Sequence, residues 1–389
     1  MRRIDIGRID LGDHRKYFEE PLRKALEVLS STGENGSIRR RLKIGARFLN
    51  KLAYSDDARG YFAVFYRRIK STGITIAKTD DLCDLVYEDE QFRVQHHWRS
   101  IRSPLPRFKR NDKRGTLDVC LDVLRRLFSY AMFYHGMGWR FDGVCDLTAI
   151  NISKDIPKSD WRAWKFIQQV IDSQNVHFCP YCNASTVYAY DTVNTTSGFM
   201  ESALDHFCPK NRYPYLAISL YNLVPSCQRC NSGAKTMGDP VKWVNGKVKF
   251  KLSHPYQDDF HSSLKFEYGQ MTAKLLSGGG TKNDIVLITV SKDALQYPLA
   301  MKSVEEFRLL KVYENSFWRY LADLPARWNL SRTGYFATSR SFLRGGLTAS
   351  QIERYLIGAP IKEDEINNHH LGKLTLDLLE QLDERGLWI

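Results

Sequence analysis

In four stretches of this chain, apolar residues recur every three or four positions, as they do on one face of a helix. The stretches lie at residues 18–29, 117–131, 161–171 and 371–382. Pro21 predicts that the first helix starts or kinks near that residue, because proline has no N–H to donate within a helix. The leucines of the last stretch are expected to pack onto the protein; a stripe that binds a partner is the less favoured interpretation.

Shorter apolar runs in the middle of the chain have the length of strands rather than helices. They lie at residues 186–190, 250–252, 264–268 and 285–290. Helical spacing returns from Ser303 onward. The pattern therefore predicts an α+β protein in which helices dominate both ends of the chain.

A chain of 389 residues is long enough for two or three domains. We expect residues 1–174 to form a mostly helical, basic region that binds substrate or a partner. Residues 175–260 are expected to form a core that carries the chemistry. Residues 261–389 are expected to begin with short strands and to end in helices.

No apolar run approaches the roughly 20 residues that a membrane-spanning helix needs. The run Ile285–Val290 has the length of a buried strand. The chain opens with charged residues, and no apolar core of a signal peptide follows them. We therefore expect a soluble, cytoplasmic protein with no membrane partner, in which cysteines bind zinc rather than form disulfides.

The chain carries 57 Lys and Arg against 44 Asp and Glu, a formal net charge of +13, which favours polyanionic partners such as nucleic acid. The positive charge is concentrated between residues 93 and 114, where Asp112 is the single acid. Pro104 and Pro106 favour an extended segment there, which could follow a nucleic-acid backbone; a solvated basic face is the alternative. The cations of this run are Arg93, Arg99, Arg102, Arg107, Lys109, Arg110, Lys113 and Arg114.

Two pairs of cysteines with the spacing CxxC are the most specific chemical signal in the chain. Cys179 and Cys182 form the first pair, and Cys227 and Cys230 form the second. Four thiolates in two such pairs predict a tetrahedral structural zinc site. A site filled by four cysteines is closed, so any chemistry must come from residues that the zinc holds in place. The alternative is a zinc ribbon without chemistry of its own, which either stabilises the fold or serves as a binding module. Cys208 lies nearby without a partner at ligand spacing and is expected to be a buried free thiol.

The residues between and after these cysteine pairs resemble the HNH endonuclease motif in its zinc-bound, four-cysteine form. More narrowly, they resemble the HNH nucleases of bacterial anti-phage defence systems such as Septu. The resemblance covers residues 175–260 and departs from the HNH pattern at its third position, which is Asn231 rather than histidine. It implies a ββα-metal core with a treble-clef-like zinc site, embedded in mostly helical N- and C-terminal regions. The segments that carry it are Leu204–Lys210 (LDHFCPK), Tyr213–Ala217 (YPYLA), Asn222–Ser226 (NLVPS), Asn231 and Lys235.

The chemistry of phosphodiester hydrolysis suits these residue types. His206 has the near-neutral pKa that a general base needs to activate water. Asp205 and Asn231 offer the hard oxygen ligands that Mg²⁺ or Mn²⁺ prefers, and such an ion would neutralise the phosphate and assist the leaving oxygen. Neighbouring strand residues point to opposite faces, so Asp205 and His206 are expected to share a site only at a strand end or an irregular turn.

Three further residues are expected to support this site. The Asn222 amide is expected to bond the backbone across the loop and so to orient the histidine strand. Lys235 could contact a phosphate, although a solvated helix lysine is the favoured interpretation. His254, in the segment His254–Pro255–Tyr256, could brace the site; a purely structural histidine is the alternative.

The sequence therefore predicts a metal-dependent endonuclease, with DNA favoured over RNA or tRNA as substrate. A non-catalytic zinc module that binds nucleic acid or protein is the competing class. No GxxxxGK[ST] sequence is present, so this chain is not expected to be an ATPase itself. The resemblance implies that a separate ATPase or sensor subunit would regulate it.

Overall fold

The computed structural model of the chain describes residues 3–31, 56–102, 115–128, 163–191, 198–200, 202–235, 238–332, 357 and 362–384. Within these residues it contains helices and small antiparallel sheets, which confirms the predicted α+β class. No described helix combines the length and the apolar character that crossing a membrane requires.

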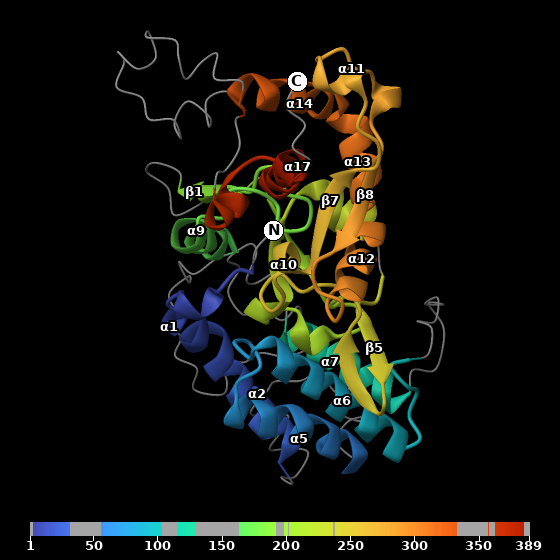
Figure 1. The fold of residues 1–389 in the computed structure, drawn as a ribbon. Helices are drawn as coiled ribbons and strands as arrows, with labels where there is room; N and C mark the ends of the chain where they lie inside the picture. The colour runs from blue at the N-terminus through green and yellow to red at the C-terminus, as the bar shows by residue number, and fades with distance from the viewer. Residues whose placement is uncertain are drawn as a thin grey trace.

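Helices form the N-terminal part of the structure and occupy one end of the molecule (Figure 1). Helix α2 packs against α5, which in turn packs against α6 and α7. The predicted first helix is present as α2, and Pro21 lies in its first turn, directly after the π-helical turn η2. The elements are η1 (Ile6–Arg8), α1 (Gly12–His14), η2 (Arg15–Glu19), α2 (Glu20–Ser30), α5 (Asp56–Ser71), α6 (Thr79–Gln95) and α7 (Thr116–Leu127).

The middle of the chain opens with helix α9 and continues as hairpins of short antiparallel strands. The strands pair as β1–β2, β3–β4, β5–β6 and β7–β8. The predicted strand over residues 264–268 is present with these bounds as β7. The elements are α9 (Ala163–Gln174), β1 (Ala189–Asp191), β2 (Gly198–Met200), β3 (Ala203–His206), η4 (Pro214–Leu216), η5 (Leu220–Asn222), β4 (Leu223–Ser226), η6 (Arg229–Ala234), β5 (Val241–Val244), β6 (Lys247–Phe250), β7 (Leu264–Tyr268) and β8 (Leu287–Ser291).

Short helices lie before and between β7 and β8, longer helices follow β8, and several of them pack around the β7–β8 pair. The helices that follow β8 begin at Tyr297, earlier than the sequence pattern predicts. The leucines of the last helix, α17, are buried, which confirms that they pack onto the protein. The elements are α10 (Phe260–Ser263), α11 (Ala273–Leu276), η7 (Lys282–Asp284), α12 (Tyr297–Glu306), α13 (Leu309–Ser316), α14 (Trp318–Arg332), η8 (Glu363–Asn368) and α17 (Gly372–Glu384).

Side chains of helix α17 supply hydrogen-bond partners to the backbone groups of β7 that do not pair with β8. The Asp377 carboxylate accepts the N–H of Phe266 at 2.9 Å. One turn later, Gln381 accepts the N–H of Tyr268 at 2.9 Å and donates to its carbonyl at 3.0 Å. Because an unpaired strand edge invites pairing with another chain, these side chains close the edge and fix the helix to the sheet.

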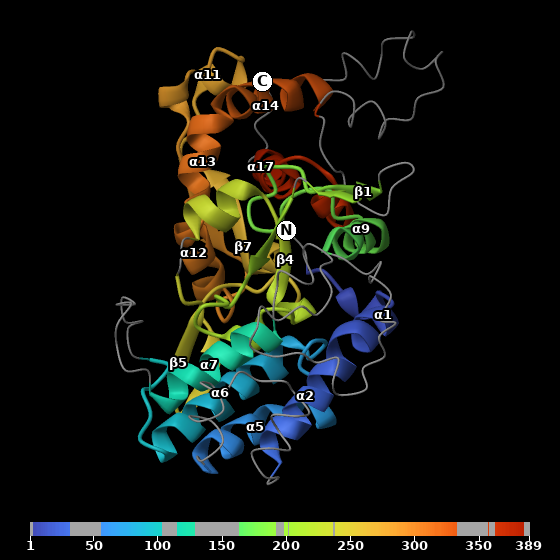
Figure 2. The ribbon, with the colours of Figure 1, turned by 180° about the vertical axis from the view of Figure 1, so that it is seen from behind.

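The N-terminal helices support the loop that joins β3 to β4, which lies near the middle of the molecule (Figure 2). The N–H of Leu220 donates to the carbonyl of Thr75 at 2.8 Å, and the Arg125 guanidinium donates to the carbonyl of Asn211 at 3.3 Å. The buried apolar residues form one continuous cluster from Ile4 to Leu382. The β3–β4 loop is therefore held by the N-terminal helices and by the continuous apolar core.

Candidate functional site

The four predicted cysteines come together in one buried cluster. Their sulfur atoms lie within 4.8 Å of one another, and those of Cys182 and Cys227 are 3.9 Å apart. Four sulfurs arranged tetrahedrally around zinc at 2.3 Å would be about 3.8 Å apart. The donor set and its spacing therefore fit a structural zinc ion held by Cys179, Cys182, Cys227 and Cys230.

The first cysteine pair is anchored by residues that lie far away in the sequence. The Tyr313 hydroxyl donates to the carbonyl of Cys182 at 2.7 Å. Asn183, which has the positive φ of 51° that asparagine tolerates, donates from its amide to the carbonyl of Ile366 at 3.0 Å. Its side-chain oxygen accepts the N–H of Lys373, also at 3.0 Å. These contacts, which no sequence pattern predicts, connect the cysteine turn to the C-terminal helices.

Strands β3 and β4 carry the predicted site, and the short helix η6 follows them. The two strands are antiparallel, with Asp205 opposite Val224 and His206 opposite Leu223. Cys227 and Cys230 lie where β4 passes into η6, and η6 packs against β3. The zinc cluster therefore fixes the helix relative to the strand that ends at His206.

His206 lies half-buried at the end of β3. Its Nε2 donates to the carbonyl of Ala217 at 2.9 Å. Since a carbonyl can only accept, the proton of the neutral ring is on Nε2 and the lone pair is on Nδ1. Burial, followed by the charge of Lys210, lowers the pKa of His206 to about 3. The ring is therefore neutral at physiological pH and has a lone pair that can accept a proton, but the expected near-neutral pKa is wrong: burial makes the ring a weaker base than the sequence predicts.

Asn222 makes the loop-bridging hydrogen bonds that its position in the sequence predicts. Its side-chain oxygen accepts the N–H of Cys208 at 2.7 Å. Its amide group donates to the carbonyls of Cys208 at 3.1 Å and Leu216 at 2.9 Å. One buried side chain thus holds both ends of the loop that carries the carbonyl partner of His206, and its contribution to catalysis stays a prediction.

Asp205 points into the core, away from His206, as regular strand geometry requires. Its carboxylate accepts a hydrogen bond from the Tyr181 hydroxyl at 2.7 Å and forms an ion pair with the Lys235 ammonium. The ammonium also donates to the carbonyl of His206 at 2.7 Å. Lys235 is only 3% exposed, so the expectation that it is a solvated helix lysine is wrong. In this position its ammonium is directed into the core rather than toward a phosphate.

Asn231 lies in η6, one residue after the last zinc cysteine. Its side chain is half-buried, and its N–H donates to the carbonyl of Cys227 at 3.0 Å. The backbone of Asn231 is therefore hydrogen-bonded to a residue of the four-cysteine cluster. A role as a ligand of Mg²⁺ or Mn²⁺ stays a prediction.

His254 and Tyr256 contact residues of the β3–β4 strand pair and of the segment that follows β3. The His254 ring packs against Phe207, the residue after His206, with the ring centres 4.2 Å apart. The Tyr256 hydroxyl donates to the carbonyl of Leu223 at 2.5 Å, and Leu223 lies opposite His206 in the sheet. The predicted bracing contacts are therefore present, and Cys208 is the buried free thiol that the sequence predicts.

Acid is expected to destabilise the protein through His254. Burial, followed by the charge of Lys235, lowers the pKa of His254 to about 3, whereas an unfolded histidine titrates near 6.5. As the pH falls below about 6.5, His254 binds a proton in the unfolded state but stays neutral in the folded state until the pH approaches 3. Each unit toward pH 3 should therefore cost about 1.4 kcal/mol of unfolding free energy. Urea titrations at several pH values should show this slope reduced in His254→Phe. The same substitution at exposed His177 is the control, and an equal slope in all three proteins would contradict the prediction.

The predicted basic run is only partly surface-exposed. Arg93 is buried in α6 and bonds the Asp89 carboxylate at 2.7 Å, which leaves its guanidinium inside the core. Arg99 lies 3.4 Å from the Asp118 carboxylate, and the exposed Arg102 stacks over the Trp243 ring at 3.9 Å. The remaining predicted cations, Arg107, Lys109, Arg110, Lys113 and Arg114, lie outside the described residues.

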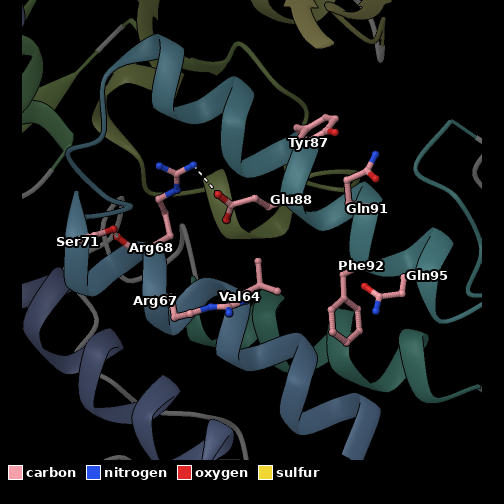
Figure 3. Close-up of a pocket in the computed structure, with 9 residues that line it drawn as sticks. All are labelled: Val64, Arg67, Arg68, Ser71, Tyr87, Glu88, Gln91, Phe92 and Gln95. Carbon is pink, nitrogen blue, oxygen red and sulfur yellow. Dashed lines mark hydrogen bonds and ion pairs between the residues drawn. The ribbon is translucent and has the colours of Figure 1, made fainter. Parts of the chain in front are cut away.

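A groove lies between helices α5 and α6, and none of the predicted site residues lines it (Figure 3). Arg68 and Glu88 form an ion pair of 2.7 Å across it. Its other lining residues are Val64, Arg67, Ser71, Tyr87, Gln91, Phe92 and Gln95. Tyr87 also lies beside Trp243, with the ring centres 6.1 Å apart, so the groove borders the β5–β6 hairpin.

Comparison with known proteins gives one partial likeness. No protein-family description matches the chain, and no solved structure matches it. The chain is 31% identical over 137 residues to the Septu protein PtuB of Bacillus thuringiensis. The match covers 34% of this chain and spans about half (49%) of the length of that curated relative. The chain is therefore similar, over about a third of its length, to a Septu protein.

Proposed function

We propose that this protein is an HNH-type endonuclease that hydrolyses nucleic acid, with DNA as the favoured substrate, and that it acts in bacterial anti-phage defence. The observation that carries the proposal is the environment of His206. A neutral imidazole is held by a backbone carbonyl at the end of β3, beside a four-cysteine cluster that fixes the following helix. The likeness to a Septu protein supports the defence role.

In the proposed reaction, His206 Nδ1 takes a proton from the water that attacks the phosphorus atom. As the new phosphorus–oxygen bond forms, the bond from phosphorus to the leaving oxygen breaks, and that oxygen takes a proton from solvent. The Ala217 carbonyl holds the ring through Nε2–H and stabilises the positive charge that the ring gains. Asn222 keeps that carbonyl in place through the bonds that close the loop. Lys210 lies close enough to lower the pKa of His206, and its ammonium would attract the negatively charged phosphate.

A catalytic Mg²⁺ or Mn²⁺ held by Asp205 and Asn231 does not fit the geometry of the described residues. The Asp205 carboxylate is buried, and its charge is already balanced by the Lys235 ammonium. A divalent ion would have to displace that ammonium from the core. We therefore assign no step of the reaction to an ion at Asp205, whereas zinc at the four cysteines fits and would act as a structural ion.

One further part of the proposal comes from the likeness to a Septu protein and from the sequence. A separate ATPase or sensor subunit is proposed as a regulatory partner, because the sequence carries no nucleotide-binding Walker motif. A non-catalytic zinc module that binds nucleic acid or protein is the competing class. The two classes differ in whether the pure protein turns over a phosphodiester substrate.

Cleavage of supercoiled plasmid and of total RNA by the pure protein tests the proposal. Reactions with Mg²⁺ or Mn²⁺ should show cutting that His206→Ala lowers by about 10²–10⁴-fold, the usual contribution of a general base. A parallel reaction with EDTA shows whether the cutting depends on a metal ion. The exposed His177→Ala, just before the first cysteine pair, is the matched control and should cut normally. Cutting that persists in His206→Ala would mean that the active site lies elsewhere. Nucleic-acid binding without any cutting would favour the zinc module.

A further inference from the structure

The β5–β6 hairpin carries positive charge on one face and apolar residues on the other. Lys242 lies directly opposite Lys249, and Val244 lies opposite Lys247. The turn consists of Asn245 and Gly246, both with positive φ (49° and 76°), as a two-residue hairpin turn requires. Because strand residues alternate between faces, the lysines share the outer face.

The outer face has no acidic residue to balance its charge. Residues 240–257 contain four lysines, Lys242, Lys247, Lys249 and Lys251, and no Asp or Glu. Within the described part of the chain, none of the four forms an ion pair or a side-chain hydrogen bond. Two lysines directly opposite each other in a hairpin repel, which disfavours the pairing unless an anion lies between them. This surface is therefore built for an anionic partner rather than for the stability of the hairpin.

The inner face fixes the hairpin to the candidate active site. The Phe250 ring packs edge-on against Phe207, the residue after His206, with the ring centres 5.0 Å apart. Trp243 packs beside Tyr87 of α6 and beneath the guanidinium of Arg102. Strand residues rise about 3.3 Å each, so the outer-face lysines extend some 10–15 Å from the Phe250 end of the hairpin. The hairpin is therefore fixed to the residue that follows His206 in the chain.

We propose that the outer face of the β5–β6 hairpin binds the phosphate backbone of duplex DNA beside the cleavage site. The proposal rests on the proposed endonuclease function and specifies where the substrate is held. A row of ammonium groups without carboxylates complements a regular line of phosphates, and a two-stranded ribbon matches the width of the B-DNA major groove. The corresponding groove of A-form RNA is too narrow for side chains to enter.

Salt-dependent binding tests the proposal without requiring cleavage. Fluorescence anisotropy with a 30-base-pair DNA would compare His206→Ala with the same protein carrying Lys242→Gln, Lys247→Gln and Lys249→Gln. Each lost phosphate contact lowers the slope of log K against log salt by about 0.9. We therefore expect the slope to fall by about 2–3 and binding in 0.1 M salt to weaken by about 10–100-fold. The lysines are at the surface, and thermal melts would verify that the triple variant folds.

The matched control removes the same charge from the opposite end of the molecule, near α11 and α13 (Figure 1). Lys274→Gln, Lys282→Gln and Lys311→Gln change three exposed lysines there and should leave the salt slope within about one unit of the parent. Equal losses in both triple variants, or no loss in the hairpin variant, would overturn the proposal. A loss confined to an RNA duplex of the same sequence would overturn the assignment to DNA. If the hairpin result holds but His206→Ala cuts normally, only the proposed active site is wrong.

Discussion

Removal of zinc is expected to unfold the middle of this protein. Zinc binding to four cysteines contributes about 10–16 kcal/mol in small zinc domains, which matches or exceeds the 5–15 kcal/mol that holds a whole protein folded. Cys227→Ser, or treatment with a strong chelator, should therefore release the metal and lower the melting temperature sharply. Metal analysis of the pure protein should find one zinc ion per four-cysteine cluster.

The loss is expected to spread beyond the metal site, because the first cysteine turn is anchored to the C-terminal helices. Tyr313 donates to the Cys182 carbonyl, and Asn183 bonds both Ile366 and Lys373. Hydrogen exchange should show α17 opening together with the cysteine turns when the metal leaves. Cys83→Ser changes a half-buried cysteine outside the cluster and serves as the control. Wild-type protein that keeps its melting temperature in the chelator would contradict a structural zinc site.

The features that local spacing determines could be predicted from the sequence. The two CxxC turns bring their sulfurs together because each turn is only four residues long, and the helical repeat of Phe18, Leu22 and Leu26 reports a buried face. The Asn222 bonds could be expected because an asparagine before a strand commonly bonds nearby backbone.

Helices α5 and α6 were not predicted from the apolar pattern, and α6 shows the reason. It buries Asp89, Glu90 and Arg93 beside its apolar residues, so its hydrophobic face does not stand out in the sequence. Asp89 and Arg93 lie one helical turn apart and satisfy each other, and the Tyr61 hydroxyl of α5 donates to Asp89 at 2.8 Å. A buried charge can be foreseen only when its partners are known.

The β5–β6 hairpin had a signal that the apolar runs alone did not reveal. The sequence Val241–Phe250 reads VKWVNGKVKF, in which Asn-Gly is flanked by alternating apolar and charged residues. An Asn-Gly pair in such a setting is the strongest short-range indication of a two-residue hairpin. The position of the hairpin against Phe207 depends on tertiary packing and could not be predicted from that pattern.

The Asp205–Lys235 pair is the second feature for which a large effect is expected. Lys235→Met keeps most of the length of the side chain but removes the ammonium that balances the Asp205 carboxylate and binds the His206 carbonyl. Removing one partner of a buried ion pair lowers the free energy of unfolding by about 3–5 kcal/mol, because the remaining charge is buried without a counter-charge or water around it. Chemical denaturation should show that loss. Lys311→Met, at an exposed position, is the control and should change stability by less than about 0.5 kcal/mol.

A double variant separates the ion pair from the packing of the lysine stem. Asp205→Asn together with Lys235→Met replaces both charges with neutral side chains of similar size, so most of the lost stability should return. The Tyr181 hydroxyl can still donate to the amide oxygen at position 205. If the double variant is as unstable as the sum of the two single variants, Lys235 acts through packing and not through Asp205.

The same variants decide whether Asp205 can hold a catalytic ion. In the wild type the ammonium of Lys235 and the hydroxyl of Tyr181 bind the carboxylate, so millimolar Mg²⁺ or Mn²⁺ is expected to leave the melting temperature unchanged. In Lys235→Met the carboxylate has lost its counter-charge, and a divalent ion that reaches it should raise the melting temperature by mass action. The double variant lacks the carboxylate and should show no such rise. A rise in the wild type that Asp205→Asn abolishes would show instead that the ion displaces Lys235, and would restore Asp205 as a metal ligand.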